Sequence, residues 1–165
     1  MLKDPKEFCR RNEKLEGGVP VAGFPRLAAL CSNPSDELKW WLEGSHSASG
    51  DIQLDLTVSG KLDLVCQRCL DTFSYSLDSK ISLLLAATEE EADEMESRLA
   101  DNDPVEVIVG GDSVNIMELI EDEVLLSIPL SPRHDACPNV PLDKLVKKPD
   151  SPFSALEGMK GRVRG

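Results

Sequence analysis

Two short segments carry the residue types that bind metals. VCQRCL, residues 65–70, holds Cys66 and Cys69 at C-x-x-C spacing, and RHDAC, residues 133–137, holds His134 and Cys137. Two thiolates separated by two residues can point at one Zn²⁺, and a closed structural site needs two further ligands. The four residues are therefore candidate ligands of a structural Cys3His zinc site, which would clip the first segment to the second.

Two other interpretations of these residues stay open. A redox dithiol is expected where C-x-x-C opens a helix, because the helix dipole lowers the thiol pKa. Here the motif ends a predicted strand and another predicted strand follows soon after, which disfavours redox chemistry. In the third interpretation Cys66 is a small core residue, Cys69 lies in a turn and His134 lies in an ordinary loop.

A predicted helix at residues 116–128 carries a group of carboxylates. Glu118, Glu121 and Asp122 share one side of it, at spacings of three and four residues. They are either a surface that binds a basic protein or a cation, or a solvated helix face. A hydrolase would need these same carboxylates, but the sequence shows no nucleophile elbow, phosphate-binding loop or HExxH motif in support.

Glu123 lies close to the apolar stripe of the same helix. A carboxylate in that position needs a partner, and Arg68 or Arg133 could supply one. We therefore predict a structural ion pair between Glu123 and Arg133. Arg68 has a second interpretation, as a contact to an RNA phosphate.

The chain has 165 residues and a formal net charge of −12, which is unevenly distributed. Residues 86–123 carry fourteen acidic side chains and one basic side chain, whereas residues 124–165 carry seven basic and four acidic ones. This balance disfavours a broad phosphate-binding surface and favours an acidic patch for a basic partner. The basic tail is a candidate RNA contact through Lys144, Lys147, Lys148, Lys160, Arg162 and Arg164.

The composition predicts a cytoplasmic protein. No apolar run reaches eighteen residues, and the segment MLKDPKEFCRRNEK lacks the apolar stretch of a secretory signal. Five cysteines are an odd number without the appearance of a disulfide framework, so we expect reduced thiols.

The N-terminal half is predicted to contain short helices and strands. DPKEFCRRNEK, residues 4–14, suits a helix capped by Asp4 and ended by Gly17-Gly18, and Pro25 opens another. Residues 38–42 alternate like a strand, and GSHSASG, residues 44–50, reads as a turn. Residues 52–58 and 62–66 are predicted to pair as a hairpin with a three-residue loop at 59–61, because this register places every apolar residue on one face.

The second half is predicted to contribute two strands and the main helix. Residues 73–85 read as one long strand and residues 105–109 as a short one. Between them, the acidic insertion at 88–104 is expected to be a solvated, mobile loop or helix. Asn115 is expected to cap the helix at 116–128, and Ser151 begins a small terminal helix. The predicted fold class is α+β, an antiparallel meander that could curl into a partly closed barrel packed against the main helix.

The order of several motifs resembles one known family. VCQRCL, then IEDEVLLSIPLSPRHDAC, then SPFSALEGMK are similar to the bacterial YceD family, the large ribosomal RNA accumulation proteins. EFCRRNEKLEGGVPVAGFPRL is similar to the N-terminal segment of proteobacterial members. The family motif positions map onto Cys66, Arg68, Cys69, Glu121, Asp122, Glu123, Pro129, His134 and Cys137.

The resemblance implies a non-enzymatic cytoplasmic factor. Such a factor would be needed for normal levels of large-subunit ribosomal RNA, and would act in ribosome assembly on that RNA, on a precursor particle or on a basic ribosomal protein. It implies one domain at residues 1–143, followed by a basic tail at 144–165. The alternative function is a small zinc- or thiol-containing regulatory protein with a C-x-x-C redox role.

Overall fold

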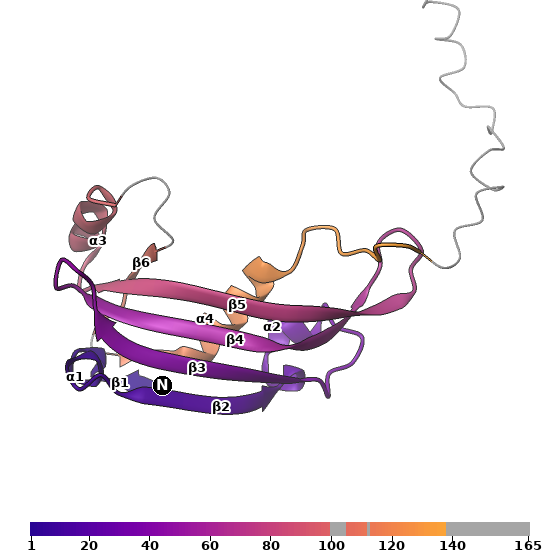
Figure 1. The fold of residues 1–165 in the computed structure, drawn as a ribbon, viewed down its shortest axis with the longest axis horizontal. Coiled ribbons are helices and arrows are strands. Elements are labelled where there is room, and N and C mark those ends of the chain that lie inside the picture. The colour runs from indigo at the N-terminus through magenta and orange to yellow at the C-terminus, as the bar shows by residue number, and fades with distance from the viewer. Residues whose placement is uncertain (100–104, 112, 138–165) are drawn as a thin grey trace, which may run out of the picture. The chain divides into compact units, whose positions relative to one another are not determined.

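The computed structural model of the chain describes residues 1–99, 105–111 and 113–137 (Figure 1). Residues up to His134 make one compact unit. The predicted terminal helix at Ser151 and the basic tail lie outside the described residues. No described helix has the length and apolar character that crossing a membrane requires.

A five-stranded sheet in the order β2-β3-β4-β5-β6 forms the body of the unit (Figure 1). The strands are β2 at Lys14–Pro20, β3 at Glu37–His46, β4 at Ile52–Val65, β5 at Thr72–Ala86 and β6 at Val105–Val109. The first four pair antiparallel in chain order, and β6 pairs parallel to β5. The predicted α+β class is confirmed, but the sheet is open and mixed instead of barrel-like, with β2 and β6 at its edges.

Helices and short strands complete the unit. The helices are α1 at Pro5–Arg10, α2 at Pro25–Ala28, α3 at Glu89–Glu96 and α4 at Ile116–Ser127, with a 3₁₀ turn at Val21–Gly23. Strands β1, Leu2–Lys3, and β7, Ser113–Val114, form a separate two-stranded pair. The predicted caps are confirmed, because Asp4 accepts a hydrogen bond from the backbone N–H of Glu7, and Asn115 accepts one from Met117.

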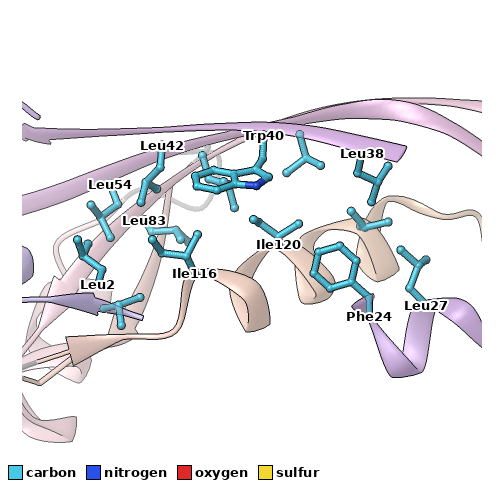
Figure 2. Packing of buried hydrophobic residues seen from close by; sticks show 14 of the residues in the cluster. Leu2, Phe24, Leu27, Leu38, Trp40, Leu42, Leu54, Leu83, Ile116 and Ile120 are labelled. Atoms are coloured by element: carbon cyan, nitrogen blue, oxygen red, sulfur yellow. The ribbon is translucent and has the colours of Figure 1, made fainter. Parts of the chain in front are cut away.

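One face of the sheet packs against α2 and α4 to form the core (Figure 2). Leu38, Trp40 and Leu42 of β3 point from the sheet toward Ile116 and Ile120 of α4 and toward Phe24 and Leu27 at α2. Side chains two residues apart on a strand share a face, so the alternating apolar residues supply a continuous buried surface.

The predicted hairpin at residues 52–66 is wrong, because β4 is a single long strand. The buried residues from Leu54 through Leu64 all lie at even-numbered positions, and so on one face of the strand. An uninterrupted strand produces that pattern as well as a hairpin does. Gly60, expected in the loop, pairs with Leu38 of β3, where a Cβ atom would lie 2.7 Å from a Leu38 methyl carbon. The strand needs glycine there for close packing, not for a turn.

The predictions that treated Gly17, Gly18 and Gly44 as breaks differ from the structure, whereas the acidic segment contains a helix, one of its two expected forms. Gly17 and Gly18 do not end a helix but lie within β2, and Gly44 lies within β3, which continues to His46. Part of the acidic insertion is ordered as α3, capped by Thr88. Ala92 and Met95 of α3 pack with Leu84 and Ala86 in a second apolar cluster.

Candidate metal centre

The turn between β4 and β5 places Cys66 and Cys69. It is closed by a hydrogen bond from the Cys66 N–H to the Asp71 carbonyl (2.9 Å) and by one from the Leu70 N–H to the Cys66 carbonyl (2.9 Å). Leu70 has a φ of 66°, in the left-handed region. The predicted position of the C-x-x-C motif, at the end of one strand and before the next, is confirmed, and no helix begins at either cysteine.

The segment after α4 lies against this turn and brings His134 to it. The Gln67 N–H donates to the Pro132 carbonyl (2.9 Å), and the Arg68 guanidinium donates to the His134 carbonyl (3.5 Å). The imidazole of His134 packs against the ring of Phe73, with centroids 5.0 Å apart. Direct contacts therefore join the two segments, whereas a clip formed by bound zinc stays a prediction.

Upstream, the end of α4 is fixed to the sheet. The Tyr75 hydroxyl on β5 donates to the Ser127 carbonyl (3.0 Å), and Pro129 follows the helix two residues later. Because this hydrogen bond holds the end of α4 to β5, the short segment that leads to His134 begins at a fixed position on the sheet. Tyr75 is thus used in packing and anchoring.

Cys66, Cys69 and His134 form a group of side chains able to hold one metal ion, each through one ligand atom. The atoms of Cys66, Cys69 and His134 lie within 4.8 Å of one another, and the Cys69 Sγ and His134 Nδ1 are 3.4 Å apart. In a tetrahedral zinc site, bonds of about 2.3 Å to sulfur and about 2.0 Å to nitrogen separate those two ligand atoms by about 3.5 Å. The observed spacing fits this geometry.

The surroundings of Cys66 favour a thiolate. Burial alone raises the pKa of this thiol, but hydrogen bonds from the backbone N–H groups of Cys69, His134 and Arg68, and from the His134 side chain, outweigh it and lower the pKa to about 5. A sulfur that receives several N–H donors and lies beside an imidazole has the environment expected of a metal ligand.

Cys31 provides a contrast on the same part of the fold. It is half-buried and forms an isolated bridge to Leu64 of β4. Burial, together with the carboxylates of Asp36 and Asp63, raises the pKa of the Cys31 thiol to about 11. The shift is opposite to that of Cys66, and Cys31 is not in the group of candidate metal ligands, which makes it a useful control residue.

The carboxylates predicted as a docking surface have different environments. Glu121 is buried and accepts hydrogen bonds from the backbone N–H groups of Arg26 (2.7 Å) and Leu27 (3.2 Å) at the start of α2. It also pairs with the Arg26 guanidinium (2.9 Å), which in turn pairs with Asp122 (2.7 Å). Sequence reasoning missed Arg26. Glu118 is exposed.

Glu123 does not have the predicted partner. It accepts hydrogen bonds from the hydroxyl groups of Ser79 on β5 and Ser127 on α4. Within residues 1–99, 105–111 and 113–137, the ion pairs include none between Glu123 and Arg133. The expectation that Glu123 needs a partner was sound, but hydroxyl donors fulfil it instead of a cation. Lys147, Lys148, Lys160, Arg162 and Arg164 lie outside the described residues.

The fold and this site together define a small α+β protein with a candidate Cys and His metal centre at one end of its sheet. Residues 54–160 match the family model described as large ribosomal RNA subunit accumulation protein YceD. The chain belongs to the YceD family. A protein of that name from Haemophilus influenzae is 28% identical over 121 residues, 67% of this chain and 63% of the relative.

The alignment thus spans less than two thirds of the relative's length. No solved structure gives a significant match. The matched segment of the family model includes both the C-x-x-C turn and the segment of His134 and Cys137.

Proposed function

We propose that this protein is a non-enzymatic factor required for the accumulation of large-subunit ribosomal RNA, acting in ribosome biogenesis in the cytoplasm. The observation that carries the proposal is the family match over residues 54–160, whose name describes this role. The relative from Haemophilus influenzae bears the same name. The partner is the large-subunit RNA, a precursor particle or a basic ribosomal protein.

We further propose that the centre binds a structural Zn²⁺ through Cys66, Cys69, His134 and Cys137. Cys137 follows His134 by three residues in the sequence, and this close spacing supports it as the fourth ligand. Three sulfurs and one imidazole are a donor set typical of structural zinc. Bound zinc would hold the β4–β5 turn to the segment after α4 and so fix the position of Arg68, a candidate contact to RNA.

A centre of this kind supports a structural role instead of a catalytic one. Catalytic zinc sites keep one position open for water or substrate, whereas four protein ligands fill the tetrahedron. The pairing of Glu121 with Arg26 and with the start of α2 also disfavours a hydrolytic use of that carboxylate. These features favour a binding protein over a hydrolase.

Sedimentation of cell lysate through a sucrose gradient tests the proposed function. The protein should migrate with large-subunit precursor particles and should move to the top of the gradient after ribonuclease treatment. A protein that remains at the top in untreated lysate would contradict direct action on the assembling particle. The Cys69→Ser variant, compared with Cys31→Ser, would report whether the metal centre is needed for that association.

A further inference from the structure

A groove with an apolar floor runs between α4 and the edge strand β6. Its volume is about 430 Å³, and Ile81, Leu83, Ile108, Leu119 and Leu125 contribute to its lining. A smaller hollow of about 320 Å³ adjoins it and shares Ile81 and Leu126. Leu126 is 75% exposed, which is unusual for a leucine beside an apolar groove unless something covers it.

The strand that borders the groove is open to further pairing. β6 is the last strand of the sheet, and in the described part of the chain no other strand pairs with its outer edge. Its sequence, VEVIV, consists of β-branched residues apart from Glu106, and Val109 is 44% exposed. Edge strands of this composition are templates for an added strand unless they are protected, and here Glu106 is the single charged residue.

The rim of the groove is acidic. Glu106, Asp122 and Glu123 line it, together with Arg26, whose charge is already paired with Asp122 and with the buried Glu121. Glu106 and Glu123 take part in none of the ion pairs formed by the described residues. Lys80 lines the adjoining hollow, but the segment 86–123 as a whole carries fourteen acidic side chains against one basic one.

We propose that this groove binds an extended segment of a basic partner protein. The segment would add a strand to β6, insert apolar side chains between α4 and the sheet, and place lysine or arginine beside Glu106 and Glu123. Charge complementarity favours this occupant over the alternatives. A nucleic acid would bring phosphates against carboxylates, and a second copy of this chain would bring a net charge of −12 to an acidic rim.

This inference deepens the proposed function, on which it rests for the nature of the partner, because it names the protein side of the interaction. It is independent of the metal centre, which involves the opposite end of β5 and the segment after α4. It also replaces the acidic docking surface predicted at Glu118, Glu121 and Asp122 with a different set of residues. The residues that carry the binding are Glu106 and Glu123 with Leu126, and Glu121 is internal to the fold.

The test uses the purified full-length protein and a fluorescein-labelled synthetic peptide in which leucine and lysine alternate. The double variant Glu106→Gln/Leu126→Ser removes one rim carboxylate and one exposed apolar side chain. The matched control Glu118→Gln/Leu130→Ser removes the same chemical groups from exposed positions that do not line the groove. All four residues lie at the surface, apart from core positions, so we expect both variants to fold.

The groove variant should bind the peptide about tenfold more weakly than the parent protein, and the control variant within about twofold. Equal losses in the two variants would mean general attraction to an acidic surface, and would overturn the proposal. So would the absence of binding by the parent protein. A peptide alternating leucine and glutamate should not bind, and equal binding of that peptide would also overturn the proposal.

Other occupants would give distinct outcomes. A dimer that dissociates only in the groove variant, measured by sedimentation equilibrium, would assign the groove to a second copy. Peptide binding that arises only after deletion of residues 144–165 would assign it to the chain's own tail. Either result would overturn the partner proposal. None of these measurements depends on migration with ribosomal particles, so the groove and the proposed function can fail separately.

Discussion

At the residue scale, the candidate ligands are well specified by their chemistry. Cysteine and histidine at short spacing are informative because few structural roles need both, and the two segments meet as the metal interpretation predicted. The sequence could not reveal the backbone donors around Cys66, because these depend on how the turn and the segment after α4 lie together.

Substitution of one cysteine should remove the metal. The purified parent protein should contain about one zinc per chain, because the donor set is that of a structural zinc site. Cys69→Ser should lose most of the zinc by elemental analysis, whereas Cys31→Ser should retain it. A parent protein without zinc, in which Cys66 and Cys69 form a disulfide under mild oxidation, would instead support the redox alternative.

Glu121 is the residue whose role the sequence described least well. Its spacing placed it with Glu118 and Asp122 on one helix side, but the partner, Arg26, is 95 positions away in the chain. Burial raises the pKa of Glu121, but hydrogen bonds from the Arg26 side chain and from the N–H groups of Leu27 and Arg26 outweigh it, so the pKa lies below its usual 4.5.

Glu121→Gln should therefore destabilise the fold by about 2 kcal/mol at neutral pH, because it weakens charged hydrogen bonds at the start of α2. A carboxylate whose pKa is lowered in the folded state stabilises the fold fully when the pH is above its ordinary pKa of 4.5. This stabilisation is lost as the pH falls through the folded-state pKa. In urea unfolding, the parent and the variant should converge as the pH decreases. A difference that is constant with pH would refute the ionised role, and Glu118→Gln is the matched control.

At the element scale, alternation predicted the strands but not their continuity. β5, β6 and α4 lie close to their expected ranges, whereas β3 continues to His46, four residues beyond its expected end. Gly17, Gly44 and Gly60 suggested breaks, yet each lies in a strand where a neighbouring side chain occupies the space of a Cβ. A sequence does not distinguish a glycine needed for a turn from one needed for close packing.

Gly44 gives a test of that distinction. A Cβ atom at this position would lie 2.9 Å from the Cα of Cys9 and 2.7 Å from the ring of Phe8, where α1 crosses β3. Because the Cys9 atom belongs to the backbone, relief requires movement of α1, and Gly44→Ala should cost about 1–3 kcal/mol in urea unfolding. Gly111→Ala, where nothing lies within 4 Å, should be neutral or slightly stabilising. Equal stability of the two variants would contradict the packing role.

At the scale of the whole molecule, the unevenly distributed charge has a structural counterpart. The acidic segment includes α3, the edge strand β6 and the beginning of α4. The candidate metal centre lies elsewhere, where β4 turns into β5. The sequence indicated that the acidic residues and the candidate metal ligands belong to separate segments. It could not indicate that the acidic segment borders an apolar groove, which depends on the parallel addition of β6 to β5.

Metal removal should loosen one end of the unit and not the whole. Hydrogen exchange in the presence of a zinc chelator should increase at residues 66–72 and 129–134, because their contacts converge on the centre. The middle of β3, β4 and β5 should keep its protection, since the core there includes fully buried Leu42, Leu56 and Val58. Global unfolding by the chelator would show that the metal supports the entire fold, and an unchanged pattern would contradict the clip.

The most direct test of the central claim is the ratio of large-subunit to small-subunit ribosomal RNA in cells depleted of this protein. We predict that the ratio falls on depletion, and that both the parent protein and Cys31→Ser restore it. Cys69→Ser should restore it less well, because the clip between the C-x-x-C turn and His134 would be lost. A ratio that does not change on depletion would contradict a role for this chain in accumulation of large-subunit ribosomal RNA.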